Sequence, residues 1–144
     1  MKPARTSIRR ATMVDADFVK NLARSLATSF NFDDAAFNET FDRIKDDEHV
    51  CLLVSNDESG AIDGYLLGFA HDVFFANGTI AWIEEMYVIE PMRRRGVGLA
   101  LETEFERWAK DQGAKLIALA TRRAAPFYSA IGYEESATYF KKLL

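Results

Sequence analysis

The chain has 144 residues and a formal net charge of −4, so it fits one domain and lacks the basic balance of a nucleic-acid-binding protein. Hydrophobic residues make up 49% and charged residues 28%, which excludes a disordered chain, and the single cysteine, Cys51, excludes a disulfide framework and a Cys-based zinc site. No uncharged run approaches the ~18 apolar residues of a membrane span, and no apolar stretch follows the basic N-terminus as a secretory signal requires; we expect one domain over residues 1–144, cytoplasmic, with neither membrane nor nucleic acid as partner.

The first part of the chain predicts one strand and two helices. Ser7–Arg10 is expected as a short strand. Thr12 followed by Asp15 is typical of a capping box. The helix after it is expected to end near Ala27, with an apolar stripe of Val14, Phe18, Leu22 and Leu26. Asn31 or Asp33 is placed to cap a second helix, whose stripe is Phe37, Phe41 and Ile44.

The period of the pattern changes at His49. His49–Ser55 and Tyr65–Val73 predict a hairpin of two strands. The turn signal Asn77-Gly78 then leads into a long strand, Thr79–Ile89, which Pro91 ends.

The C-terminal part predicts a helix, a strand, a short helix and two more strands. The first helix follows Gly98, ends at Gly113 and buries Val97, Leu101, Phe105 and Trp108. We expect a buried strand over Lys115–Thr121, a helix over Arg123–Ala130, and two strands in Tyr133–Leu144, the last over Thr138–Leu143. A strand, a helix and a second strand in succession favour a parallel pair. The fold class is therefore α/β (α+β), a mixed sheet with helices on both faces.

Arginines are concentrated in an otherwise acidic chain. Arg93, Arg94 and Arg95 stand directly before Gly96 and Gly98, at a strand–loop–helix junction. Glycines let backbone N–H groups reach a ligand, and a helix N-terminus attracts anions. The junction predicts a pyrophosphate cradle. It lacks the Gly-Lys-Ser/Thr of a nucleotide P-loop, and Leu101 stands where a dinucleotide site has its third glycine.

Two spaced motifs carry a resemblance to a known family. Arg93-x-x-Gly96-x-Gly98 is followed by Ala124-x-x-Phe127-Tyr128 and then by Gly132-Tyr133. With these motifs the chain resembles the GNAT superfamily of N-acetyltransferases over nearly its whole length. The resemblance implies a mostly antiparallel sheet with a splayed parallel strand pair, acetyl-CoA as cosubstrate, no metal, and direct attack by a primary amine. It also allows a homodimer.

The resemblance further implies which residues hold the cosubstrate. Backbone groups of Met86 and Val88 would pair with pantetheine, and the Met86 N–H would stabilise an oxyanion. The expected cofactor-binding set is Met86, Val88, Arg93, Arg94, Arg95, Gly96, Val97, Gly98, Leu99, Phe127 and Tyr128.

An amine must lose a proton before it attacks, because an alkylamine with a pKa of ~10.4 is mostly charged at pH 7. Glu84 lies two residues before Met86, so strand alternation puts both on one face and makes Glu84 the expected general base. Glu85, on the other face, is the alternate general base. The alternative interpretation is that both glutamates are only surface or ion-paired carboxylates. Tyr128 matches the family tyrosine proposed as general acid; the alternative is packing against pantetheine.

The remaining candidates concern the acceptor and a covalent route. Aromatic residues in two loops, with one carboxylate, are expected to edge the acceptor site: Phe30, Phe32, Asp33, Phe74 and Phe75. Cys51 is expected to be a buried hydrophobe, although His49 two residues away leaves an acyl-cysteine route open, and His71 is expected to be structural or a pocket wall. Three functions stay open: acetylation of a small cationic or amino-acid-like amine, acetylation of a peptide or protein, and a non-catalytic acyl-CoA-binding module.

Overall fold

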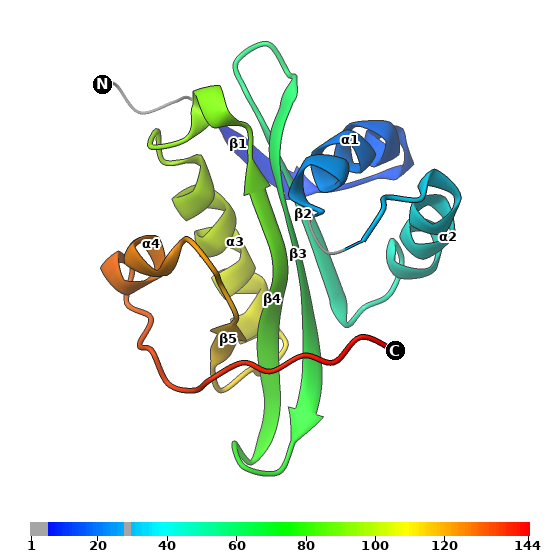
Figure 1. Ribbon diagram of the computed structural model, residues 1–144. Coiled ribbons are helices and arrows are strands. Elements are labelled where there is room, and N and C mark those ends of the chain that lie inside the picture. The colour runs from blue at the N-terminus through cyan, green and yellow to red at the C-terminus, as the bar shows by residue number, and fades with distance from the viewer. Residues whose placement is uncertain (1–5, 28–29) are drawn as a thin grey trace.

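The computed structural model describes residues 6–27 and 30–144, which form a mixed five-stranded sheet flanked by helices (Figure 1). The sheet order follows the chain from β1 to β5. The strands are β1 (Ser7–Arg10), β2 (Val50–Asn56), β3 (Ile62–Val73), β4 (Gly78–Val88) and β5 (Ile117–Leu119). The helices are η1 (Met13–Asp15), α1 (Ala16–Leu26), α2 (Asp34–Ile44), η2 (Glu90–Met92), α3 (Val97–Asp111) and α4 (Ala125–Ala130).

Helices cover both faces of the sheet, as predicted. Figure 1 shows α1 and α2 on one side of the strands and α3 and α4 on the other. The α3 face buries Leu66, Leu101 and Phe105, and the α1–α2 face buries Val54 and Tyr65. Each cluster removes apolar surface from water, which is the main favourable term in folding. The two clusters therefore hold the sheet from both faces, and with it the strand ends that border the candidate site.

Helix α1 forms where the sequence predicts it, and Leu22 and Leu26 pack against the α1–α2 cluster as expected, but the first half of the predicted stripe is wrong. Val14 and Phe18 are 79% and 57% exposed, whereas Val19 and Ala23 are buried. The stripe begins at Asp15, a buried carboxylate that accepts hydrogen bonds from Arg9 and from the Thr12 N–H. Val19 and Ala23 follow Asp15 at four-residue steps and share its face. The prediction missed the stripe because its first member is charged.

Strand β4 contains a β-bulge at Glu84. Leu67 of β3 pairs with Glu85, but the next β3 residue, Gly68, pairs with Ile83. Glu84 therefore has no partner in the ladder, and the alternation of side chains shifts by one residue at this point. Ile83 and Met86, three residues apart, both pack against the α3 cluster.

The parallel pair is confirmed, but it is shorter than predicted. β5 pairs with β4 only from Ala81 to Ile83, and its residues are half-buried. The two strands predicted in Tyr133–Leu144 are wrong, since that described segment contains no strand. Strand propensity reflects fit to a sheet surface, and a three-residue edge strand offers little ladder to join. The segment instead crosses in front of β4 and β3 (Figure 1).

Within residues 6–27 and 30–144, no helix has the length and apolar character needed to cross a membrane.

Candidate active site

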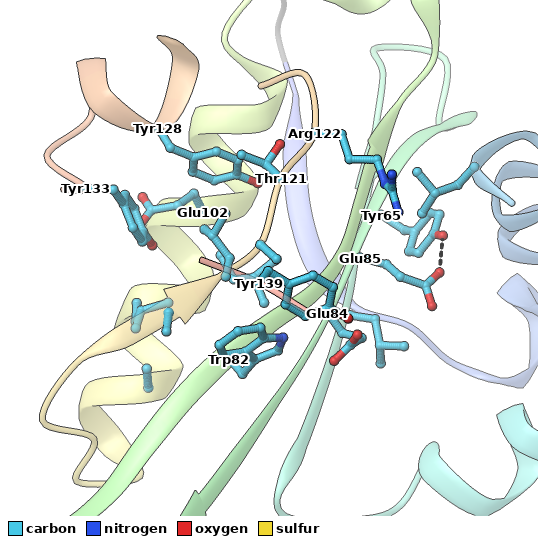
Figure 2. Close-up of a pocket in the computed structure, with 18 of the residues that line it drawn as sticks. Tyr65, Trp82, Glu84, Glu85, Glu102, Thr121, Arg122, Tyr128, Tyr133 and Tyr139 are labelled. Atoms are coloured by element: carbon cyan, nitrogen blue, oxygen red, sulfur yellow. Dashed lines mark hydrogen bonds between the residues drawn. The ribbon is translucent and has the colours of Figure 1, made fainter. Parts of the chain in front are cut away.

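A cleft of about 1910 Å³ lies along β4 and β5 and reaches both layers of helices. Figure 2 shows Glu84, Glu85 and Tyr65 on one side of it and Glu102, Tyr128 and Tyr133 on the other. Its wall carries seven acidic and four basic side chains. The acidic members are Asp33, Glu84, Glu85, Glu102, Glu106, Glu134 and Glu135, and the basic ones Lys110, Lys115, Arg122 and Lys141. The excess of carboxylates favours a cationic ligand.

The bulge corrects the predicted orientation of the two glutamates. Met86 packs toward α3, whereas Glu84 lines a smaller hollow with Phe69, His71 and Trp82. Glu84 and Met86 therefore do not share a face, although they are two residues apart. Glu84 and Glu85 both line the main cleft, because a bulge interrupts the alternation that would separate adjacent side chains.

The two carboxylates differ in their partners. The Tyr65 hydroxyl donates to Glu85 Oε1 at 2.7 Å, and Tyr65 itself is 1% exposed. Burial, reinforced by the charge of Glu85, raises the pKa of this phenol, so it remains a donor. Glu84 is exposed, and no side chain in the described part of the chain bonds to it. One carboxylate is thus held in place and the other is available to a ligand.

The outer edge of β4 is open beyond Ile83, where pairing with β5 stops. The Ile89 N–H donates to the Asp63 carbonyl at 2.9 Å. Because this bond joins the residues that flank Val88 and Gly64, Val88 and Gly64 face each other as a non-hydrogen-bonded pair of the antiparallel ladder. Such pairs alternate along an antiparallel ladder, so Met86 and Leu66 form another. The backbone N–H and C=O groups of Met86 and Val88 therefore point away from β3, toward the open edge.

The arginine–glycine loop continues directly from this edge. Arg93 Nε donates to the Val88 carbonyl at 2.8 Å, and its guanidinium lies 5.3 Å from the centre of the Tyr87 ring. Arg94 is exposed with φ 61. Arg95 lies against Met92, and its Nε is buried without a partner among the described residues. The three arginines thus differ in their surroundings. Buried polar groups are normally hydrogen-bonded, so Arg95 Nε is an exception among the described residues.

The start of α3 can accept a backbone-bound anion. Gly96, at φ 87, is the N-cap, and the helical bonds begin with Ala100 N–H donating to the Gly96 carbonyl at 3.0 Å. The N–H groups of Val97, Gly98 and Leu99 belong to the first turn, where an α-helix leaves its donors unpaired. The Val97 side chain is buried in the core, so only its backbone faces the loop. A Cβ on Gly98 would lie 3.5 Å from the Phe127 ring, so the glycine lets this ring approach the start of the helix.

Helix α4 brings Phe127 and Tyr128 to the other side of the gap. Thr121 Oγ1 accepts from the Ala124 N–H at 3.1 Å and helps to begin the helix. The two rings meet edge to face at 5.0 Å. Burial, with a smaller contribution from the charge of Glu102, raises the pKa of Tyr128 to about 12. Tyr128 is therefore a protonated phenol on the wall of the cleft.

Four of the five residues predicted for the acceptor site line the cleft: Phe30, Phe32, Asp33 and Phe75. Asp33 also caps α2 by accepting from the Ala36 N–H at 3.0 Å, and Phe32 packs on Phe37. Phe74 lies outside the cleft wall and is fully exposed at the hairpin end. The structure thus brings the two loops together, with Phe74 as the exception.

The covalent route has no support in the geometry. Cys51 is fully buried in the α3 cluster, and burial raises its thiol pKa to about 11. The His49 side chain is exposed beside Glu48, at 3.5 Å. A buried, protonated thiol without a base is a poor nucleophile. His71 lines the hollow beside Trp82, and no group of three or more metal-ligating side chains occurs in the described residues.

Sequence reasoning assigned no role to three residues of this site, although Tyr133 belongs to one of the two family motifs. Tyr65 holds Glu85, and Tyr133 donates to the buried Glu102 at 2.9 Å. Glu102 had a detectable signal, since it is a charged residue within the apolar stripe of Leu101 and Phe105. Tyr65 had none, because a strand tyrosine reads as an ordinary core residue.

Comparisons with known proteins show the family and the fold of the chain. The model of the acetyltransferase (GNAT) family matches residues 17–133. An aminoglycoside N(6')-acetyltransferase type 1 from Acinetobacter genomosp. 13 is 29% identical over 120 residues, which cover 76% of this chain and 81% of that protein. A transcriptional regulator from Bacillus halodurans C-125 has a similar structure, with a TM-score of 0.85 and 24% identity over 97% of this chain and 100% of its own. The aminoglycoside N-acetyltransferase AAC(6')-Iy, in complex with CoA, gives a TM-score of 0.84 and 19% identity over 98% and 97% of the two chains.

Proposed function

The chain belongs to the GNAT family of acetyltransferases, and from this we propose that it transfers an acetyl group from acetyl-CoA to a primary amine of a small cationic molecule. The transfer proceeds by direct attack within a ternary complex. The observation that carries the proposal is the bulge in β4. It places two carboxylates on one face of the strand and turns backbone donors toward the open edge beside them.

The residues on either side of the gap fit acetyl-CoA. The first turn of α3 offers backbone N–H groups at the positive end of the helix dipole, which suits a pyrophosphate. Arg94 and Arg95 add positive charge, and a Cβ at Gly96 would meet open space, so the backbone before the helix is accessible to a ligand. The outward-facing amide groups of Met86 and Val88 match the amides of a pantetheine arm. Arg93 bonds to the Val88 carbonyl and must release it when pantetheine takes that place.

The reaction divides among three groups of this chain. Glu84 removes a proton from the ammonium form of the acceptor, directly or through one water. The neutral nitrogen then attacks the thioester carbonyl, and the Met86 N–H stabilises the oxyanion. Collapse of the tetrahedral intermediate breaks the carbon–sulfur bond, and Tyr128 protonates the departing thiolate. The nitrogen gives its second surplus proton to water, and the Tyr128 phenolate recovers a proton from water, so the amide and CoA thiol are the products. Glu85, held by Tyr65, attracts and orients the amine.

The charge of the cleft supports a small cationic acceptor. Asp33, Glu134 and Glu135 extend the acidic lining beyond the two glutamates of the bulge. Phe30, Phe32 and Phe75 provide an apolar wall for the body of the molecule. The relative from Acinetobacter genomosp. 13 acts on aminoglycosides according to its name, and these are small molecules with several amines.

A panel of acceptors tests this proposal. We expect release of CoA thiol from acetyl-CoA with diamines or aminoglycosides, little with uncharged amines, and little with lysine-containing peptides. Mass spectrometry of the acceptor identifies the acetylated product. Faster turnover of peptides would assign the chain to protein acetylation, and binding of acetyl-CoA without any turnover would leave a non-catalytic acyl-CoA module.

A further inference from the structure

Glu102 is a buried carboxyl group for which the reaction above has no use. It lies on α3 and is 4% exposed. Burial raises its pKa, and the hydrogen bond from Tyr133 opposes this only in part. Glu106 raises the pKa of Glu102 further, whereas the charge of Lys110, which pairs with Glu106 at 3.0 Å, lowers it. The neighbours of Glu102 are thus a phenol and a second carboxyl group, and no cation forms an ion pair with it among the described residues. Burying a carboxyl group without a cation costs stability, which points to a role other than packing.

Tyr133 connects Glu102 to the helix that carries Tyr128. Gly132, at φ 104, turns the chain back at the end of α4. The Tyr133 N–H then donates to the Tyr128 carbonyl at 3.0 Å, and the two rings meet edge to face at 5.4 Å. The Tyr133 hydroxyl donates to Glu102 Oε1 at 2.9 Å. Tyr133 therefore contacts Tyr128 through its backbone N–H and its ring, and it contacts α3 through its hydroxyl group.

The Tyr128 ring is held between two aromatic neighbours. Phe127, next to Gly98 at the start of α3, meets it edge to face at 5.0 Å, and Tyr133 meets it edge to face at 5.4 Å. Gly98 and Glu102 are four residues apart, so they lie on one face of α3. Helix α4 and the turn after it thus contact α3 twice, one helical turn apart. Phe127 makes an apolar contact at Gly98, and Tyr133 makes a polar contact at Glu102. Figure 2 shows Glu102, Tyr133 and Tyr128 grouped on one wall of the cleft.

We propose that Glu102 is a positioning residue for Tyr128: through its hydrogen bond with Tyr133 it fixes the phenol at the gap between β4 and β5. The inference rests on the proposed function, in which Tyr128 is the general acid. The negative charge of Glu102 also favours the protonated phenol, which is the form that donates. Glu102 itself transfers no proton. An alternative is that the pair only anchors the C-terminal segment to α3.

Three variants separate positioning from anchoring. Glu102→Leu removes the acceptor and the charge, Tyr133→Phe removes only the donor, and Glu102→Gln keeps an acceptor oxygen. We expect the first two to lower kcat about tenfold or more, since small displacements of reacting groups have effects of this size or larger. KM for acetyl-CoA should stay nearly constant, and Glu102→Gln should recover most of kcat. Glu102→Leu should keep or raise Tm, because an apolar side chain replaces a buried charge.

A double-mutant cycle with Tyr128→Phe gives the decisive readout. If Glu102 acts through the Tyr128 hydroxyl, Glu102→Leu has no further effect on kcat in the Tyr128→Phe background. An equal loss in both backgrounds, a fall in Tm that accounts for the lost activity, or full activity of Tyr128→Phe would each overturn the positioning role.

A measurement that needs no turnover keeps the test independent of the proposed function. Ring-labelled tyrosine gives an NMR signal for Tyr128, which Tyr128→Phe identifies. We expect Glu102→Leu and Tyr133→Phe to shift or broaden this signal and Glu102→Gln to leave it nearly unchanged. An unchanged signal in all three variants overturns the inference. Absence of acetyl transfer by the wild-type protein would instead contradict the proposed function, while the ring signal still decides the positioning.

Discussion

At the scale of single residues, the two glutamates of the bulge are the sharpest test of the chemistry. Glu84→Gln should lower kcat about 100-fold or more at pH 7, the size of effect that a general base contributes. The loss should shrink as pH rises, because the unprotonated fraction of the amine increases without help. The measurement is the pH dependence of kcat for both proteins with one amine acceptor.

Glu85→Gln is the matched control, since it changes the neighbouring carboxylate on the same face. We expect a rise in KM for the amine and a smaller change in kcat, because Glu85 orients the acceptor. A pH profile of Glu84→Gln that runs parallel to the wild type would remove Glu84 as the base. A larger kcat loss in Glu85→Gln would transfer that role to Glu85.

Asp15 makes a separate prediction, about stability. Hydrogen bonds from Arg9, joined by that of the Thr12 N–H, lower its pKa in spite of burial. A carboxylate of this kind stabilises the fold fully above its ordinary pKa, and its contribution is lost as pH falls through the lowered value. Asp15→Asn should therefore cost about 2–3 kcal/mol at neutral pH, as expected for hydrogen bonds to a charged group.

The difference in unfolding free energy between wild type and Asp15→Asn should narrow below about pH 4, near the ordinary pKa of aspartate. Urea unfolding across this range measures it. Asp17→Asn, an exposed acid two residues later in the helix, is the control and should change stability far less. A difference that stays constant with pH would mean that the Asp15 charge does not contribute.

The element scale shows what the sequence could and could not predict. The glycine–arginine junction, α2 with its Asp33 cap, and the Asn77-Gly78 turn were all predictable, because local chemistry determines each of them. The bulge was not, since strand periodicity assumes unbroken alternation. That assumption put Glu84 on the face of Met86. The burial of Glu102 could be suspected from its place in an apolar stripe, but its partner Tyr133 lies 31 residues away and could not be identified.

Gly98 separates the role of α3 in binding from its role in folding. An added Cβ meets only ordinary contacts, and alanine favours a helix over glycine by up to ~1 kcal/mol. Gly98→Ala should therefore keep or raise Tm. It should weaken acetyl-CoA binding about tenfold or more, because the methyl group enters the space that α3 shares with Phe127 and Met86 beside the proposed pyrophosphate donors. Isothermal titration with acetyl-CoA measures the change.

The control for this variant is Thr103→Ala, at an exposed position of the same helix. It should leave acetyl-CoA affinity unchanged. Equal affinity of Gly98→Ala and wild type would place the pyrophosphate elsewhere.

Gly68 tests the packing of the bulge against α3. It pairs with Ile83 beside Glu84, and a Cβ there would clash with the Phe105 ring and lie 2.9 Å from the Trp82 carbonyl. Gly68→Ala should destabilise the protein by about 1–3 kcal/mol, the usual cost of overpacking a core. Thermal unfolding measures this, and Phe105→Leu in the same background should recover part of the loss. Unchanged stability would mean that β3 and α3 separate without cost.

At the scale of the whole molecule, the fold creates one opening and directs several elements to it. β4 extends five residues beyond the last residue that pairs with β5. The bulge, the arginine loop, the start of α3 and helix α4 all border the edge that this leaves open. The family resemblance implied the splayed strand pair, the arginine–glycine loop and the Phe127-Tyr128 wall from two motifs, but not the bulge. The course of Tyr133–Leu144 across the strands was not predictable, because it depends on how far β5 extends.

Thermal unfolding with and without acetyl-CoA tests the central claim most directly, with NAD and ATP as control ligands. Acetyl-CoA at 100 times its Kd should stabilise the fold by about 2.7 kcal/mol, which is a rise of several degrees in Tm for a domain of this size. We expect this rise with acetyl-CoA, a much smaller one in Gly98→Ala, and none with NAD or ATP. An unchanged Tm at saturating acetyl-CoA would contradict the account, because the gap beside β4 would then not be a CoA site.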